Sequence, residues 1–293
     1  MNEALRRENA NASGGVAHPP FHFDYIDATA IRNAHAFQFE GYSFIAITLP
    51  MVQCLWDTSE RLSRGLYVRN ALGFHADEVE AVAVHGALFQ MQLSFLVSHE
   101  YTHHIHGHAA ASGVWSEFSQ DAAKGNIDSQ AEELIADTFA AYLTLANFVR
   151  GDGRPGTLQQ LGKAGMEGTD GDDVLLNCFL LAVMASFCVL WHSRLDMQSA
   201  ADNSHPPPPI RINYLIEITK MWCGQFGSVP PGWFATDRLR GLFGAAAEVA
   251  TVADRQAWDT HIAAIRDAGG ELYQIQLRAR FEEMRKRGSV LAP

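Results

Sequence analysis

The chain has 293 residues, of which 47% are hydrophobic and 19% charged, a composition typical of folded globular proteins that excludes disordered and collagen-like chains. The 22 Lys and Arg against 33 Asp and Glu give a formal net charge of −11, which disfavours nucleic acid and anionic membrane surfaces as partners. A chain of this length buries enough surface to fold without disulfide bonds.

The four cysteines are widely spaced and form no Cys-x-x-Cys pair, so the sequence predicts neither a disulfide framework nor a thiolate zinc site. The N-terminal residues are polar and charged where a secretory signal peptide would be apolar. We therefore expect a cytoplasmic protein with a mobile tail over residues 1–18 and a single domain over residues 19–293.

The first predicted elements follow one another directly along the chain. Aromatic and β-branched residues predict a strand at 42–48, and apolar spacing predicts a helix over 49–66 with Pro50 in its first turn. A second helix is predicted from about residue 77 to 106, and a third over about 129–149, each with acidic residues near its start.

Residues 151–173 contain seven glycines and one proline, which predicts a flexible connection or a lid. Residues 174–191 carry no charge over 18 positions, which is the short end of a membrane span. The length and the polar Asn177 and Ser186 favour a buried core helix over a span.

Four consecutive prolines predict a stiff extended turn before a helix that starts near Ile210, and two amphipathic helices are predicted over 236–253 and 254–287. The overall expectation is an α+β fold that is mostly α-helical, with a small edge sheet.

The strongest local motif is His99-Glu100-Tyr101-Thr102-His103, an HExxH sequence at the end of the second predicted helix. Residues four apart share one helical face, so the two imidazoles can bind one metal ion. Glu100 is rotated away from the ligand pair, and its carboxylate can reach a water on that ion. The motif therefore predicts half of a zinc site and its general base.

A catalytic zinc site needs a third protein ligand. The metzincin pattern is excluded, because the position of its third histidine is Ala109. In the third predicted helix, Glu133 and Asp137 are four apart on one face. One of them can bind zinc while the other accepts an imidazole N–H from a ligand histidine.

Three segments, 99–108, 132–141 and 204–212, together resemble the gluzincin peptidases, namely the soluble cores of the CAAX-prenyl endopeptidase and HtpX-type peptidases and the Lit-type phage-exclusion peptidases. Those families have an HExxH with a further His five residues on, an ExxAD helix, and a His-Pro turn followed by an Arg. Residues 32–36 partly resemble the Asn-Ala-Phe-Ala stretch that leads into their edge strand, with His35 in place of the Phe.

The resemblance implies a zincin-like metalloprotease core with one zinc ion per chain. His99 and His103 match the zinc histidines, and Glu133 matches the third ligand. Glu100 matches the general base, and Asp137 matches the carboxylate that orients a ligand histidine. Three further positions complete the implied site: an outer histidine, the residue that steadies the oxyanion, and its associated arginine, here His108, His205 and Arg211.

Some roles stay open at this level. His106 lies on the ligand face and is expected to be a hydrogen-bonded neighbour of the site or a surface residue. Tyr101 and Tyr214 are rivals of His205 as the oxyanion donor.

The sequence thus predicts a zinc-dependent endopeptidase that acts on a protein or peptide substrate, with Glu100 as general base. An extended substrate is expected to pair with the edge of the strand at 42–48. The alternatives are a defence or stress protease that is inactive without an activating partner, a non-catalytic zinc-stabilised scaffold, and a protease anchored in a membrane through 174–191. The presence of Glu100 argues against the scaffold, since metal binding alone does not require that residue.

Overall fold

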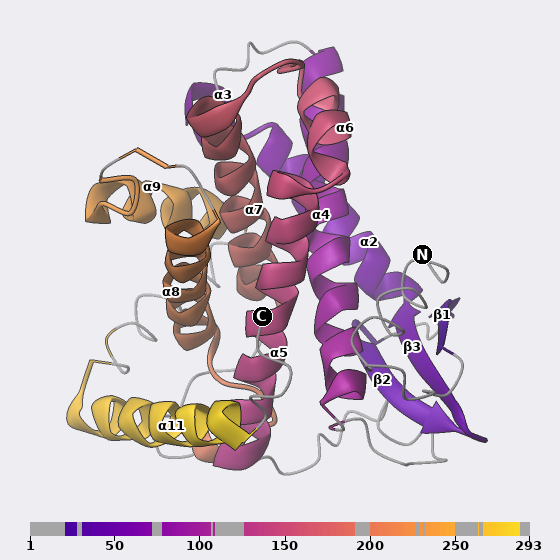
Figure 1. Ribbon diagram of the computed structural model, residues 1–293, viewed down its shortest axis with the longest axis vertical. Coiled ribbons are helices and arrows are strands. Elements are labelled where there is room, and N and C mark those ends of the chain that lie inside the picture. The colour runs from indigo at the N-terminus through magenta and orange to yellow at the C-terminus, as the bar shows by residue number, and fades with distance from the viewer. Residues whose placement is uncertain are drawn as a thin grey trace.

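The computed structural model is mostly helical, with one small sheet beside the lower end of the long helix α4 (Figure 1). The predicted α+β class is confirmed. The predicted tail over 1–18 lies outside the residues that the structure describes, which are 21–27, 31–71, 78–106, 108, 126–190, 200–226, 229–230, 232–249, 263 and 266–287.

The sheet has three strands in the order β1-β3-β2, namely β1 (Phe21–Ile26), β2 (Ala34–Phe39) and β3 (Tyr42–Thr48). β3 confirms the predicted strand. It pairs with β1 in parallel and with β2 in an antiparallel hairpin. The hairpin turns at Glu40 and Gly41, both with positive φ, as tight two-residue turns require.

The expected substrate edge at 42–48 is wrong, because β3 has a partner strand on each side. A strand paired on both sides has no free N–H and C=O groups for a peptide. Among the described strands, the hairpin partner β2 forms one outer edge of the sheet and β1 forms the other.

The three predicted N-terminal helices are present. α2 (Leu49–Ser63) begins where the Thr48 hydroxyl accepts the Met51 N–H, and Pro50 occupies its first turn. α4 (Glu78–Ile105) is the longest helix of the described chain. α5 (Ile127–Leu145) begins with a capping box between Asn126 and Ser129 and continues into a π-helical turn, η2 (Ala146–Arg150). The short α3 (Leu66–Ala71) follows α2.

The apolar segment forms most of α7 (Gly168–Leu190), which lies in the centre of the bundle (Figure 1). Two described helices are long and apolar enough to cross a membrane, judged by length and composition, over Ala81–Ile105 and Gly168–Leu190. In the second, 89% of the apolar window is buried inside the protein. α7 is therefore a buried core helix, as the sequence predicted for residues 174–190.

The glycine-rich segment 151–173 differs from the predicted connection or lid. It contains a helix, α6 (Gly153–Gln160), and the beginning of α7. Leu158 and Leu161 are buried in the main hydrophobic core. This burial stabilises a helix whose glycine content disfavours it locally.

In the described C-terminal third, α8 (Pro208–Gln225) and α9 (Thr236–Ala247) lie along one side of the bundle and α11 (Ala268–Arg287) lies across the lower end of α5 (Figure 1). α8 starts inside the proline run, and α9 packs on α7. α11 crosses the start of α5, where Arg280 binds the Asp128 carboxylate with two nitrogens at 2.7 and 2.9 Å.

Candidate metal centre and adjoining cavity

The last turns of α4 bring His99 and His103 together. The two residues are one helical turn apart, and their ring centroids are 4.9 Å apart. Their Nε2 atoms face each other at 3.2 Å. Both rings therefore direct a nitrogen to one point, as the spacing of the motif predicts.

Glu133 reaches the same point from α5, the helix that packs beside α4 (Figure 1). Its Oε2 lies 3.2 Å from His99 Nε2, and its Oε1 lies 3.3 Å from His103 Nε2. His99, His103 and Glu133 thus form a group that could hold a metal ion, with ligand atoms within 4.8 Å of one another. Of the two carboxylates left open by spacing alone, Glu133 is the one that joins the histidines.

The donor atoms of these three side chains are compatible with a zinc ion. Glu133 Oε2 is buried and accepts no hydrogen bond of good geometry. Ligand atoms about 2.0–2.1 Å from a tetrahedral zinc ion lie about 3.3 Å apart. The separation of 3.2 Å between the two Nε2 atoms is close to that value, and each carboxylate oxygen of Glu133 lies at a similar distance from one histidine, Oε2 at 3.2 Å from His99 and Oε1 at 3.3 Å from His103. Two imidazoles and a carboxylate are also a donor set that zinc prefers.

Asp137 lies one turn beyond Glu133 and orients the first histidine. Its Oδ1 is 3.0 Å from His99 Nδ1, so the ring donates Nδ1–H to the carboxylate, and Nε2 is the nitrogen that can bind a metal once its proton is released. Arg211 of α8 holds the same carboxylate with Nε and Nη2, at 2.8 and 2.6 Å. Asp137 is 1% exposed, so these contacts are shielded from water.

The protonation states of His99, Glu133 and Asp137 depend strongly on one another. Burial lowers the pKa of His99, but Glu133 and Asp137 outweigh it and raise that pKa to about 10. Burial raises the pKa of Glu133, but His205 and His99 hold it well below its usual range. Burial likewise opposes Arg211 and His99, which hold the pKa of Asp137 below its ordinary value. The carboxylates are therefore charged and ready to bind a cation.

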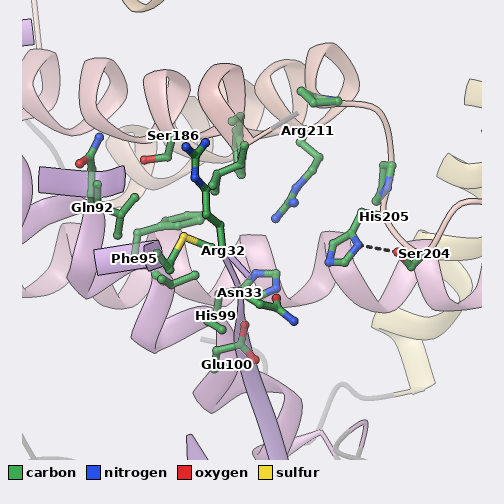
Figure 2. A pocket seen from close by; sticks show the side chains of 18 of the residues that line it. Arg32, Asn33, Gln92, Phe95, His99, Glu100, Ser186, Ser204, His205 and Arg211 are labelled. Carbon is green, nitrogen blue, oxygen red and sulfur yellow. Dashed lines mark hydrogen bonds between the residues drawn. The ribbon is translucent and has the colours of Figure 1, made fainter. Parts of the chain in front are cut away.

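His205 lies across the site from the end of α4. Its Nε2 is 3.2 Å from Glu133 Oε2, its Nδ1 is 2.8 Å from the Ser204 hydroxyl, and its side chain is 49% exposed. Figure 2 shows His99 and Glu100 on one side and Arg211 and His205 on the other. The structure thus brings every predicted catalytic residue to one place.

A cavity of about 570 Å³ opens at this place and is lined by Glu100, His99, His205 and Arg211. It continues along α4 past Phe95 to Gln92 (Figure 2). At 1.5 Å per residue, the distance from residue 100 to residue 92 is about 12 Å along the helix. The remaining wall comes from α2, α4 and α7, from the start of β2 and the residues before it, and from the segment that leads into α8. These residues are Arg32, Asn33, Ala34, Met51, Leu55, Leu96, Ser186, Phe187, Leu190, Asp202, Asn203, Ser204, Pro206 and Pro208.

The other predicted residues have different surroundings. The His108 ring is 5.6 Å from the His103 ring, beside the ligand but outside the ligand group, and the His106 ring packs edge-on against Phe139 at 4.6 Å. Tyr101 is buried against the sheet, and Tyr214 packs against Phe281. Neither tyrosine is among the described residues that line the cavity.

Arg211 has a contact that sequence reasoning did not predict. Its guanidinium group is hydrogen-bonded to Asp137 and also lies 4.4 Å from the Phe187 ring.

The cavity residues Gln92 and Phe95 were not predicted from the sequence either. Their spacing of seven and four residues before His99 places them on the face of α4 that carries that ligand, which is a signal the sequence contains.

The described residues thus form a mostly helical protein with a His-His-Glu group that could hold a metal ion. Over residues 57–222, more than half of the chain, the sequence matches the Peptidase U49 family. The chain belongs to this family and is therefore a peptidase, for which proteins or peptides are the substrates. No curated protein and no solved structure matches it. The family supports the predicted resemblance to Lit-type peptidases, whereas the resemblance to CAAX-prenyl and HtpX-type peptidases stays a prediction.

Proposed function

We propose that this chain is a zinc-dependent endopeptidase of the gluzincin type, with His99, His103 and Glu133 as ligands and Glu100 as general base. The observation that carries the proposal is the His-His-Glu group, whose member His99 lines a cavity together with Glu100, in a chain of a peptidase family. A zinc ion held there would act as a Lewis acid that polarises the scissile carbonyl and lowers the pKa of water toward about 7.

The roles of the protein residues follow from their positions. Glu100 is 7% exposed and lines the cavity next to the ligand His99, where it accepts a proton from the attacking water and passes it to the leaving amine. His205 lies across the site and donates to the oxyanion, a contribution of about 3–4 kcal/mol for one donor. Arg211 acts mainly through Asp137, because that carboxylate engages two of its nitrogens.

The cavity gives the proposal a substrate preference. Two polar residues beyond the catalytic end are hydrogen-bonded inside the protein: Gln92 donates to the Ala182 carbonyl and accepts from Ser59, and Ser186 donates to the same carbonyl. The charged Arg32 also lines this part of the cavity (Figure 2). The wall between these polar residues is formed by Leu55, Phe95, Phe187 and other apolar side chains. A large apolar side chain next to the scissile bond gains most from such a pocket.

The sheet supplies a place for the substrate backbone. Asn33 and Ala34 line the cavity, and Ala34 begins β2, which has an outer edge among the described strands. An extended peptide added to that edge forms backbone hydrogen bonds while one side chain enters the cavity. The outer edge of β2 thus replaces 42–48 as the proposed docking strand.

The test is a comparison of wild type with Glu100→Gln on unfolded casein and on peptides with one apolar residue at a varied position. We expect Glu100→Gln to lose at least about 10²-fold in turnover while keeping one zinc ion per chain. His103→Ala is expected to lose zinc affinity itself. Glu217→Gln is the matched control, since Glu217 lies on α8 and pairs with Arg278 at 3.6 Å on the surface.

Three outcomes separate the alternatives. Equal turnover in wild type and Glu100→Gln would contradict the mechanism. A wild-type chain that binds zinc but cleaves nothing would favour the scaffold. Cleavage of a cellular target in activated cells by a chain that is inert on casein would favour the partner-triggered protease.

A further inference from the structure

Gln130 is a fully buried amide three residues before Glu133 on α5, and the described hydrogen-bond partners of its side chain are not members of the His-His-Glu group. Its Nε2 donates to the carbonyl oxygens of Ala200 and Asn203, at 2.6 and 2.7 Å. Those residues begin and follow a single 3₁₀ turn, η3 (Ala200–Asp202). One side chain therefore fixes two backbone carbonyls of the same short segment.

This segment leads directly to the catalytic His205. Asn203 is two residues before His205, and the Asn203 N–H bonds back to the Ala200 carbonyl. His205 in turn contacts Glu133, one turn after Gln130 on the same helix. α5 thus holds the segment at two points, with Gln130 at the backbone and Glu133 at the imidazole.

The orientation of the Gln130 amide depends on α11. The Tyr273 hydroxyl donates to Gln130 Oε1, and Tyr273 is 4% exposed in a cluster with Ala200 and Ile210. The amide has one carbonyl oxygen and two N–H donors. A reversed amide would place its oxygen against two carbonyl oxygens, so the tyrosine contact and the two carbonyl contacts select the same orientation.

We propose that Gln130 and Tyr273 are positioning residues for His205. This inference rests on the proposed function for the role of His205, and it extends the site to α11. α11 spans Ala268–Arg287, beyond the residues 57–222 that match the family. The helix thus contributes to the catalytic geometry through one hydroxyl, although it does not reach the cavity.

The test combines hydrogen exchange of the intact chain with steady-state kinetics. Gln130→Met keeps the shape of the side chain and removes both donors, so we expect exchange at 200–205 to rise about tenfold relative to α7. We expect kcat to fall about 10-fold or more while KM stays within about twofold and zinc stays at one per chain, because a small displacement of a catalytic group costs turnover. Tyr273→Phe should show the same changes in smaller size.

Two control variants test for a general loss of stability. Thr58→Val removes a fully buried donor on α2, and Tyr142→Phe removes a hydroxyl from the same helix as Gln130. Neither should raise exchange at 200–205 relative to α7. Unchanged exchange at 200–205 in Gln130→Met, or an equal rise in Thr58→Val, would overturn the inference. The exchange result stands even if wild type cleaves nothing, so a failure of the proposed function is seen separately in the kinetics.

Discussion

Two buried aspartates of this protein are bound by arginine in similar ways but in different settings. Asp172 is fully buried and accepts from Arg150 at 2.6 Å and from Arg154 at 2.7 Å. Asp137 is 1% exposed and accepts from Arg211, and it also accepts from His99 of the metal group. The difference is the His99 imidazole, which contacts Asp137 through Nδ1 and the proposed ligand Glu133 through Nε2.

The comparison teaches where a buried charge serves stability and where it serves chemistry. Each carboxylate is neutralised by arginine, because an unpaired buried charge is costly. At Asp172 the pairs tie α7 to η2 and α6, three consecutive elements of the chain. At Asp137 the ion pair with Arg211 joins α5 to α8, and the hydrogen bond with His99 Nδ1 fixes the tautomer of this proposed metal ligand.

The largest expected effect is on stability, at Asp172. Asp172→Asn leaves two arginines near a neutral amide, so we expect the free energy of unfolding to fall by about 3–5 kcal/mol. Urea denaturation measures this change, and zinc affinity of the folded fraction should match that of wild type. A tenfold loss of zinc affinity would remove the distinction between the two aspartates.

Asp137→Asn is expected to act on the metal. We expect zinc affinity to fall by about 10–100-fold, or about 1.4–2.7 kcal/mol, because His99 loses the acceptor that orients it. Competition with a chelator measures the affinity, with Asp172→Asn as the matched control for a buried aspartate. Zinc affinity equal to that of wild type would reduce Asp137 to a structural residue like Asp172.

The comparison extends to two histidines of α4, namely His99, which contacts two carboxylates, and His104, which bonds to a backbone carbonyl. His104 donates to the Phe44 carbonyl at 2.7 Å, and burial lowers its pKa to about 4. Below pH 6.5 the unfolded chain binds a proton that folded His104 does not, so stability falls as the pH drops from about 6.5 to about 4.

His104→Gln keeps a donor and removes this titration. We expect the slope of unfolding free energy against pH to decrease by up to about 1.4 kcal/mol per pH unit in this range, the value for one proton. Denaturation midpoints at pH 7 and pH 5 measure it. The same slope in both chains would show that other groups, such as His108, account for the acid sensitivity.

The smallest effect is expected at an exposed aspartate. Asp237 is 96% exposed and lies 3.2 Å from Arg240 on the same helix. Asp237→Asn should leave stability and zinc affinity unchanged within error, because exposed pairs are screened by water. A clear loss would mean that burial does not set the ranking of these aspartates.

The sequence predicted most elements that follow a strong period. The strand at 42–48 and the helices from 49, 77 and 129 are present because each carries its own apolar pattern and start signal. The strands β1 and β2 were missed, since their stability depends on pairing with β3. α6 was missed because its glycines suggest a loop, and only burial against the core favours a helix.

The candidate site shows the same division. The spacing of His99 and His103 predicted the histidine pair, and the resemblance to the gluzincin peptidases selected Glu133 over Asp137 for the group that the structure brings together. The contact of Tyr273 with Gln130 joins residues 143 positions apart, and no local pattern indicates such a pair. The inner position of β3 likewise depends on a parallel partner that lies outside the hairpin.

The central position of α7 has a consequence for the synthesis of this protein. The helix packs against α8 and α9, which follow it in the chain. At about 5–20 residues per second, the ribosome needs several seconds to make those helices after residue 190. During this interval α2 and α4, which precede α7, can already cover part of it, while the face that packs on α8 and α9 stays uncovered. We therefore expect the yield in cells to depend on chaperones that cover this face until translation is complete.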